Sequence, residues 1–405
     1  MAAILLVLNG STGGAALTAR DLVIQLKLKG HQVYVASPPN ILKSPVEVFG
    51  EIADGVEEVA LPSWNKNYRR PRWKRPLYFV YHLLKSRAHL RPVLRLQTLI
   101  RRWSIDIVHT NTALTIDGAI AAKLAGVPHV WHIREEIGQH ALFRFSLPEP
   151  VLSRVFVGLS ERIVTNSKFS QAFFRRSGLE SKTTVVYNGL PLERFRKTSA
   201  STTFRKKWAP DSSTVLFGMI ANVTSHFKRH DIFIRAAARV IREGYNARFV
   251  VIGFDPVQQK AYRSDLAYAQ TLRKLVRDEE LEAHFIWAGY QSDIPSAMNA
   301  LDVLVHPCEQ EGFGRIAVEA MAAKKPVIVS DGGGLSEIVV AEKTGIKVPP
   351  GDADSLASAM TFMCTHGDER LDMGLQGYER AKEMFSLENM VAQVDKIYQE
   401  IAAIR

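Results

Sequence analysis

Cysteine is almost absent from this sequence of 405 residues, in which only Cys308 and Cys364 occur. Two cysteines do not make the disulfide framework that stabilises small secreted domains, so we expect no such scaffold. Long apolar runs are also missing, because Ile4–Leu8 is far shorter than the roughly 20 residues of a membrane-spanning helix. No basic residue precedes this run, since the first is Arg20, so it lacks the pattern of a signal peptide. We therefore expect a cytoplasmic protein.

The overall composition is that of an ordinary globular protein. Hydrophobic residues make up 46% and charged residues 23% of the chain, and no collagen-like or coiled-coil repeat is present. These values exclude a mostly disordered protein. At roughly 100–200 residues per domain, the length predicts two or three domains.

Acidic residues are absent from one long basic segment, Trp64–Arg102, which contains 12 Lys and Arg residues. The first 200 residues hold 28 Lys and Arg against 14 Asp and Glu, so this half carries the excess behind the net charge of +11. Such a cluster can bind nucleic acid, an anionic lipid surface or a phosphorylated substrate, or it can be a solvated basic face.

The basic segment also has an apolar pattern. Its residues with helical spacing are Leu77, Val80, Tyr81, Leu84 and Ala88. The aromatic residues interleaved with its cations are Trp64, Trp73, Tyr78, Phe79 and Trp103. The pattern fits an interfacial amphipathic helix or helix pair, broken near Pro92, or a flap that faces the substrate.

Strand-like and helix-like segments alternate along the chain, which predicts an α/β fold with doubly wound parallel sheets. The strands expected in the first half are Ala3–Leu8, Gln32–Ser37, Glu58–Leu61, Ile105–Thr110, His129–Ile133, Arg162–Asn166 and Thr184–Tyr187. After a polar stretch without periodicity, the pattern restarts with strands at Val215–Ile220, Ala247–Ile252, His284–Trp287, Val303–His306 and Pro326–Ser330.

We therefore predict two Rossmann-like domains in series. The predicted boundaries are an N-terminal domain at 1–195, a linker at 196–213, a C-terminal domain at 214–385 and a final helix at 386–405. Open α/β sheets bind ligands at the carboxyl ends of their strands, so we expect the ligand site in a cleft between the domains.

The most informative stretch is His306–Val339, in which a strand is followed by a glycine-containing loop and a helix. The glycines let the backbone approach a ligand, and the N–H groups at the helix start suit a phosphate. Glu311 stands just before this helix and Glu319 about one turn into it, and both side chains lean toward its N-terminus. Because a carboxylate repels phosphate, these acids suit the hydroxyl groups of a sugar and a ribose on either side of a diphosphate. The alternative is a helix whose acidic residues only stabilise its dipole.

This Glu-x₇-Glu pattern, with EGFG and the following PVIVSDGGG, resembles the signature of the retaining glycosyltransferases of family 4 (glycosyltransferase group 1), which have the GT-B fold. Further segments similar to that family are Val185–Phe195, Gly218–Ala237, Phe285–Cys308, Val348–Met360 and Phe385–Val391. The resemblance covers nearly the whole chain. It implies an acceptor-binding N-terminal domain, a nucleotide-sugar-binding C-terminal domain and a last helix that crosses back to the N-terminal domain.

The activity that the resemblance implies is the transfer of a hexosyl or N-acetylhexosaminyl group, with retention of configuration, from a UDP- or GDP-sugar to an acceptor hydroxyl. The acceptor would be a glycan or a lipid-linked compound in the synthesis of cell-surface polysaccharide, lipopolysaccharide or glycolipid. The basic segment would then hold the enzyme on an anionic surface at the inner face of the cell membrane, and no nucleic-acid partner is expected.

The resemblance also assigns residues. The implied catalytic residues are Glu311 near the hydroxyls of the transferred sugar, His132 at a strand end, and Lys228 on the leaving diphosphate. The implied donor-binding residues are Glu319, Gly13, Gly14, Asn222, Arg229, Gly289, Tyr290, Gly312, Phe313, Gly314, Arg315 and Ile316. The implied acceptor-binding residues are His109, Arg134 and Glu135.

One position departs from the family pattern. The family usually carries a second diphosphate-binding Arg shortly after the first strand of this domain, where this chain has Ile220, Ala221 and Asn222. Either Lys228 or Arg229 then binds the diphosphate alone, or Asn222 forms a hydrogen bond to it instead. A further alternative is that the protein has reduced activity.

Metals and other functions give the remaining alternatives. Asp352 and Asp354 form the Asp-x-Asp of another glycosyltransferase fold, but they precede an amphipathic helix, so N-capping explains them better. With no His/Cys ligand cluster recognised, we expect no metal and no cofactor. The alternative functions are a nucleotide-sugar epimerase of the same fold and a non-catalytic basic protein that binds nucleic acid or lipid.

Overall fold

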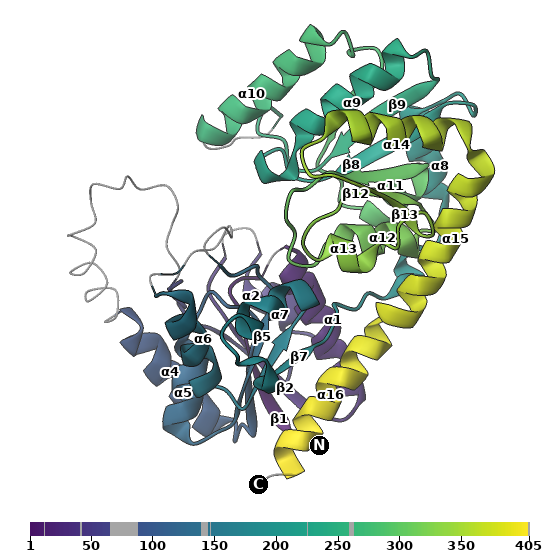
Figure 1. Cartoon of the computed structure of the whole chain (residues 1–405). Coiled ribbons are helices and arrows are strands. Elements are labelled where there is room, and N and C mark those ends of the chain that lie inside the picture. Colours follow the sequence, from purple (N-terminus) through teal and green to yellow (C-terminus); the bar gives the residue numbers. More distant parts are fainter. Residues whose placement is uncertain are drawn as a thin grey trace, which may run out of the picture. The chain divides into compact units, whose positions relative to one another are not determined.

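The computed structural model describes residues 1–11, 13–40, 43–64, 88–138, 145, 147–224, 226–258 and 263–403. The chain divides into two compact units, whose elements are labelled in Figure 1. Unit 1 comprises Met1–Gly189 and Leu387–Arg405, and unit 2 comprises Leu190–Ser386. Each unit contains one parallel sheet with its own buried core, which confirms the predicted fold class. The predicted cleft between the domains stays a prediction.

The sheet of unit 1 has seven strands in the order β3-β2-β1-β4-β5-β6-β7. The strands are β1 (Ala3–Val7), β2 (Gln32–Ser37), β3 (Gly55–Glu58), β4 (Ile107–Thr110), β5 (His129–Ile133), β6 (Arg162–Thr165) and β7 (Thr183–Val185). Every residue of β1 is buried, as expected for a central parallel strand with helices over both faces of its sheet. The strand order reverses between β1 and β4, so the carboxyl ends of these strands are where an α/β sheet binds ligands.

The helices of unit 1 include the last helix of the chain. They are α1 (Gly14–Leu28), α2 (Pro45–Phe49), α4 (Leu90–Arg102), α5 (Asp117–Ala125), α6 (Glu149–Gly158), α7 (Lys168–Arg175) and α16 (Leu387–Ala403). In Figure 1, α16 is the yellow helix that lies along α1. Leu22 and Leu26 of α1 share one buried cluster with Met390, Val394 and Ile397 of α16. The prediction that the last helix packs on the N-terminal domain is therefore confirmed.

The sheet of unit 2 has six strands in the order β10-β9-β8-β11-β12-β13. The strands are β8 (Val215–Ile220), β9 (Ala247–Ile252), β10 (Phe285–Gly289), β11 (Val303–His306), β12 (Val327–Ser330) and β13 (Gly345–Val348). The order reverses between β8 and β11, which places a second ligand-binding edge at the carboxyl ends of these two strands.

The helices of unit 2 pack on this sheet and on one another. They are α8 (Ser199–Trp208), α9 (His230–Arg242), α10 (Arg263–Asp278), α11 (Ile294–Ala300), α12 (Arg315–Ala322), α13 (Leu335–Ile338), α14 (Ala353–Thr365) and α15 (Gly367–Met384). Short 3₁₀ turns lie at Glu180–Lys182, Leu192–Phe195 and His226–Lys228, and the last of these (η4) leads into α9. Helices α9 and α14 lie side by side (Figure 1).

The segment 196–213, which the sequence analysis treats as an irregular linker, contains helix α8 and belongs to unit 2. Phe204 and Trp208 stand one turn apart on this helix with ring centroids at 4.8 Å, and Trp208 is buried. Arg205 Nη1 donates to Asp302 Oδ2 at 2.5 Å. Two aromatic residues among many polar ones give too weak a period to be recognised, and tertiary packing decides the structure of this segment.

Strand β3 also differs from its prediction, which was Glu58–Leu61. In the structure it covers Gly55–Glu58 and pairs with β2 in a register that sets Gly55 opposite Tyr34. A side-chain carbon at Gly55 would lie 3.0 Å from the Tyr34 ring, so a glycine fits this position. Val59 and Leu61 are buried just beyond the strand. Because buried residues alternate with exposed ones there, the sequence pattern predicted the strand three residues too far along the chain.

Most of the basic segment, residues 65–87, lies outside the described residues, including all but the last of the helically spaced apolar positions. Pro92 lies in the first turn of α4, where proline is tolerated, and the predicted helix break near it stays a prediction because it also concerns residues before Ala88. Trp64 packs against Phe156 and donates from Nε1 to the Ala113 carbonyl at 2.7 Å, so it belongs to the edge of the core. Trp103 stacks on Tyr34. Among the described residues, no helix combines the length and the apolar character that crossing a membrane requires.

Candidate functional site

In unit 2, the loop between β11 and α12 carries the Glu-x₇-Glu signature. Gly314 precedes α12 with a φ of 96°, in the left-handed region. A side-chain carbon there would lie 2.4 Å from Leu335 Cδ2, so both backbone and space require glycine. The loop therefore turns tightly into α12 at the carboxyl edge of the sheet. A helix start in this position favours an anion through its backbone N–H groups and dipole.

A second glycine loop, at Gly332–Gly334 after β12, supports the signature loop. A side-chain carbon at Gly333 would lie 2.4 Å from the Glu311 carbonyl oxygen. The Gly334 N–H donates to that same oxygen at 2.7 Å. The backbone of Glu311 is thus held in place by the loop that follows the neighbouring strand.

The side chain of Glu311 accepts from two donors. Lys228 Nζ, at the end of the η4 turn, lies 2.5 Å from Glu311 Oε2. His306 Nε2, at the end of β11, lies 3.2 Å from the same oxygen. Burial opposes the charge on Glu311, but the His306 hydrogen bond and the Lys228 ammonium outweigh it and hold the pKa of Glu311 well below its usual range. Glu311 is therefore a carboxylate at neutral pH.

The two other positions considered for diphosphate binding are already engaged. The Arg229 guanidinium binds both carboxylate oxygens of Asp231, at 3.0 and 3.1 Å, and also binds Glu309. These partners, Asp231 foremost, raise the pKa of Arg229 further. Asn222 Oδ1 accepts from the Phe254 N–H at 2.9 Å and so fixes the loop after β9. Of Asn222, Lys228 and Arg229, Lys228 is the one whose partner is itself a predicted substrate-binding residue.

The remaining predicted donor-binding residues divide between the loop surface and the core. Glu319 Oε1 accepts from Arg315 Nε at 2.8 Å, and both side chains are largely buried. Gly312 and Ile316 are partly exposed. Phe313 is buried and its ring meets Phe385 edge-on at 5.8 Å, so its side chain packs in the core.

Gly289 and Tyr290 lie at the carboxyl end of β10. Gly289 has a φ of 69°, and a side-chain carbon there would lie 2.2 Å from Gln258 Oε1. Tyr290 is 63% exposed, so its ring is available at the same edge of the sheet as the signature loop.

Sequence reasoning missed His306 and Cys308, and its statement that no His/Cys cluster is present was wrong. One potential ligand atom from each of His306, Cys308 and Glu311, which follow one another closely after β11, lies within 4.8 Å of the others. Burial, with the nearby Glu311 carboxylate, raises the pKa of Cys308 to about 12, so its thiol is protonated. The Lys228 ammonium occupies the side of Glu311 where a cation would bind. The letters HPC before the signature were the available signal for this cluster.

In unit 1, His109 at the end of β4 and His132 at the end of β5 lie together, with ring centroids 5.3 Å apart. Both are fully buried, and burial, followed by the Arg134 charge, lowers the pKa of His132 well below its usual range and that of His109 to about 3. Arg134 Nη2 lies 3.4 Å from His132 Nδ1 and donates from Nε to Asn111 Oδ1 at 2.7 Å. Tyr398 of α16 bonds His109 Nδ1.

These contacts fix the proton of His132. A guanidinium can only donate, so Nδ1 accepts and the proton of the neutral ring is on Nε2. Within the described part of the chain, the buried Nε2 atom has no partner. The Nε2 atom of the neighbouring His109 also lacks a partner there, so this feature does not separate a ligand-contacting His132 from a structural one, and that role stays a prediction.

The other predicted residues of unit 1 lie at the start of α1 and in the loop after β5. Gly13 has a φ of 88° at the start of α1, and nothing lies within 4 Å of the place of its missing side chain. Glu135 instead accepts from the Thr112 hydroxyl at 2.5 Å and from the Ala113 N–H at 2.8 Å. Its carboxylate therefore organises the loop after β4.

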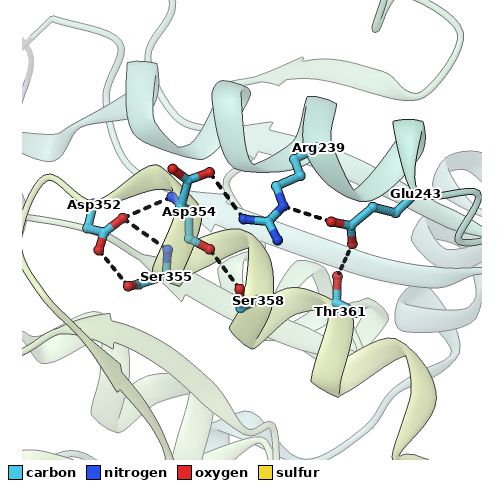
Figure 2. Close-up of polar contacts among 7 residues, drawn as sticks. All are labelled: Arg239, Glu243, Asp352, Asp354, Ser355, Ser358 and Thr361. Carbon is cyan, nitrogen blue, oxygen red and sulfur yellow. Dashed lines mark hydrogen bonds and ion pairs between the residues drawn. The ribbon is translucent and has the colours of Figure 1, made fainter.

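The Asp-x-Asp sequence caps a helix, as predicted. Asp352 Oδ1 accepts from the backbone N–H groups of Asp354 and Ser355, each at 3.0 Å, at the start of α14. Asp354 instead bonds Arg239 of α9 at 3.1 Å, and Figure 2 shows the two carboxylates engaged with different partners. Asp352 thus caps α14, and Asp354 joins α14 to α9.

Comparisons with known proteins agree with this architecture. The family described as "Glycosyl transferases group 1" matches residues 200–380, and "Glycosyltransferase Family 4" matches residues 12–194. The lipopolysaccharide core biosynthesis mannosyltransferase LpsB of Rhizobium meliloti is 26% identical over 67% of this chain and 79% of its own length. The D-inositol 3-phosphate glycosyltransferase of Thermobifida fusca is 26% identical over 92% of this chain and 85% of its own length.

Among solved structures, Anabaena HepE in complex with UDP superposes with a TM-score of 0.79 at 21% identity, covering 99% of this chain and 100% of its own. At this identity the likeness concerns the fold. The two family matches cover one unit each and together span nearly the whole chain. The chain therefore belongs to the group 1 glycosyltransferases of the GT-B fold.

Proposed function

We propose that this glycosyltransferase moves a sugar from a nucleotide-diphosphate sugar to an acceptor hydroxyl with retention of configuration and without a metal ion. The observation that carries the proposal is the Lys228–Glu311 pair beside the N-terminus of α12, at the carboxyl edge of the unit 2 sheet. It sets one cation, one carboxylate and a helix start together, which suits a diphosphate joined to a polyhydroxylated sugar.

In this proposal, unit 2 binds the donor. Lys228 and the start of α12 bind the diphosphate, Glu311 accepts from hydroxyls of the transferred sugar, and Glu319 accepts from the ribose. Negative charge grows on the diphosphate as the glycosidic bond breaks, so a cation held there stabilises the transition state more than the ground state. The leaving diphosphate takes the acceptor proton, and the protein contributes positioning and electrostatics.

Unit 1 binds the acceptor and contributes His132. With its proton on Nε2, the neutral imidazole offers a hydrogen-bond donor to a ligand hydroxyl at the carboxyl end of the unit 1 sheet without adding positive charge. Gly13 and Gly14 supply the open backbone at the end of β1 for a phosphate or hydroxyl group. One relative is named as a lipopolysaccharide core biosynthesis mannosyltransferase and another as a D-inositol 3-phosphate glycosyltransferase, so we propose a glycan or lipid-linked acceptor in cell-surface glycan synthesis.

The test is donor turnover with a panel of UDP- and GDP-sugars and a lipid and glycan extract as acceptor, following release of the nucleoside diphosphate. UDP-sugars come first, because the Anabaena neighbour was solved with UDP. We expect release with at least one donor, loss of release in Glu311→Gln, and an unchanged rate with EDTA. Proton NMR of the product then gives its anomeric configuration. A product with inverted anomeric configuration would contradict the retaining mechanism. Conversion of the donor without any acceptor would identify an epimerase instead.

We further propose that α4 brings the enzyme to an anionic membrane surface. Its outward residues include Leu90 and Leu94, which are 60% and 52% exposed. The exposed cations Arg91, Arg101 and Arg102 accompany them, and α4 contains no acidic residue. Two exposed leucines one turn apart among arginines match an interface of apolar chains and anionic headgroups.

A further inference from the structure

Two donors from different parts of unit 2 bind the same carboxylate oxygen of Glu311. Lys228 Nζ is 2.5 Å from Oε2 and comes from the turn before α9. His306 Nε2 is 3.2 Å from Oε2 and comes from the end of β11. The two donors differ in mobility, because an ammonium on a four-carbon chain moves readily, whereas the His306 ring is 1% exposed within the sheet.

The protonation of His306 follows from its partner. An ionised carboxylate can only accept, so His306 donates through Nε2–H. Burial lowers the pKa of His306 against the opposing effect of Glu311, so the ring is neutral and Nδ1 carries no proton. In the described part of the chain, the buried Nδ1 has no partner. The hydrogen bond to Glu311 is thus the polar contact that the structure gives this ring.

Donor binding would compete for only one of these donors. The proposed function places a diphosphate next to Lys228, and a diphosphate carries more negative charge than one carboxylate. Lys228 then turns partly or fully from Glu311 to the phosphates, and Glu311 loses its cation at the moment it must bind the sugar. A buried carboxylate without a partner is costly and rises in pKa, so a second, immobile donor is needed.

We propose that His306 is a positioning residue that keeps Glu311 ionised and correctly oriented when Lys228 moves to the donor diphosphate. This inference rests on the proposed function. His306 itself touches neither donor nor acceptor in it and acts through Glu311.

The same residues could be read as a zinc site of His306, Cys308 and Glu311, and the observations favour positioning. The Lys228 ammonium is 2.5 Å from the carboxylate oxygen that a metal would need, and Cys308 Sγ donates to the Gln310 carbonyl at 3.3 Å as a protonated thiol. Zinc binding is therefore kept as an outcome of the test.

The kinetic test compares His306→Phe, which keeps the ring volume but removes the donor, with His306→Gln, whose amide nitrogen can replace Nε2. We expect His306→Phe to lower kcat by about 10- to 100-fold, the usual loss for a hydrogen bond to a charged group, with a much smaller change in donor KM. We expect His306→Gln to recover most of that loss. The acid limb of the kcat–pH profile should move to higher pH in His306→Phe, because Glu311 then protonates more easily.

A second measurement does not depend on activity. In the Lys228→Met background, the lysine is absent, as the proposal requires in the donor complex, and Glu311 can be titrated by ¹³C NMR of its carboxyl carbon. Adding His306→Phe should raise the pH of that titration by about 1–2 units. Cys364→Ser in the same background is the matched control, because Cys364 interacts with Arg370 and Asp302 rather than with Glu311, and it should leave the titration unchanged.

The outcomes separate the inference from the proposed function. Wild-type kcat in His306→Phe, an equal loss in His306→Gln, or a Glu311 titration that His306→Phe does not move would overturn the positioning role. Inhibition by micromolar Zn²⁺ that Cys308→Ser abolishes would identify a metal site instead. If no donor is turned over but the titration moves as expected, the proposed function fails while the His306–Glu311 coupling holds.

Discussion

At the scale of single residues, the two signature glutamates are held by different cations. Glu311 is bound by Lys228 and His306, from outside its own helix, whereas Glu319 is bound by Arg315 of the same helix. If Glu311 contacts the reacting sugar and Glu319 the ribose, their loss has different kinetic effects. An interaction made equally in ground and transition state changes KM, and one strengthened in the transition state changes kcat.

We therefore predict that Glu319→Gln raises donor KM by about tenfold or more, and that Glu311→Gln lowers kcat by about 10- to 100-fold. Steady-state kinetics with varied donor, together with calorimetric binding of the nucleoside diphosphate, measure both. Glutamine keeps the size of each side chain, so the comparison isolates charge. Equal effects of both substitutions on KM and kcat would contradict the assignment of the two glutamates to different parts of the donor.

Lys228 gives a second prediction at this scale. Lys228→Met should lower kcat by about 100-fold or more, as for other groups that stabilise a developing anion. Its effect on the unfolding temperature should be small, because Glu311 keeps His306 as a partner. The matched control is Arg229→Met, which removes a cation bound to Asp231 and Glu309 and should cost more stability and less turnover. A Lys228→Met protein that loses stability and activity in equal measure would indicate a structural ion pair.

Some site residues could be identified from the sequence, whereas others became visible only in the structure. Glu311, Glu319 and Gly314 belong to a fixed pattern along the chain, so a single sequence displays them. His306 and Tyr398 are defined by contacts in space: Tyr398 bonds His109 across most of the sequence. The engaged state of Arg229 also depends on Glu309, which arrives from another loop. The distant contacts of Tyr398 and Arg229 leave no local spacing to read, and His306, although it lies five residues from Glu311, has no fixed place in the signature.

At the scale of elements, the sequence predicted buried strands best. The bounds of β2, β5, β8, β9 and β11 agree with the predicted ones, because a short run of β-branched and apolar residues between polar loops leaves little choice. Predictions failed for β3 and α8, whose positions depend on the neighbouring strand and on the stacked pair of Phe204 and the buried Trp208. Elements with few apolar residues are placed by their neighbours rather than by their own period.

Helix α16 gives the prediction at this scale, through the pairing of Asp395 with His31 at 2.9 Å and with Lys29 at 3.2 Å. Burial opposes the charge of Asp395, but the hydrogen bonds from His31 and Lys29 outweigh it and lower its pKa. A depressed carboxyl pKa adds stability above the unfolded value, about 3.9, and this stability is lost as the pH falls through the lower folded value.

Asp395→Asn should therefore destabilise the protein by about 1–3 kcal/mol at neutral pH, and the difference from wild type should shrink below about pH 4. Urea unfolding followed at several pH values measures this difference. Glu400→Gln on the exposed part of the same helix is a suitable control and should have a smaller effect. A difference that stays constant down to acid pH would show that the carboxylate charge is not the cause.

At the scale of the whole molecule, the excess positive charge belongs to the half of the chain that includes α4. We predict that the protein binds vesicles containing anionic lipid at low salt and leaves neutral vesicles unbound. Each cation near such a surface adds about 1 kcal/mol, and the attraction weakens with salt, as the Debye length falls to about 8–10 Å at physiological ionic strength.

Replacing Arg91, Arg101 and Arg102 by Gln should reduce vesicle co-sedimentation, while donor binding is retained. The same loss of charge at Lys206, Lys207 and Lys274 of unit 2 is the matched control and should have little effect on sedimentation. Leu94→Ser tests the apolar part of the surface. If the wild-type protein does not bind anionic vesicles at low salt, the membrane proposal is wrong. The basic segment is then better explained as an acceptor-phosphate site or a solvated face.

The membership of α16 in unit 1 has a consequence for how the chain is made. The ribosome completes Leu190–Ser386, a continuous unit, before it adds the helix that covers Leu22 and Leu26 of α1. We expect unit 2 to reach its native state first. Until α16 is synthesised, part of the core of unit 1 stays exposed to solvent, and a chaperone would be needed to protect it. A translation arrest before Leu387 would then leave a protein whose second half, Leu190–Ser386, resists protease, whereas its first half is cleaved readily.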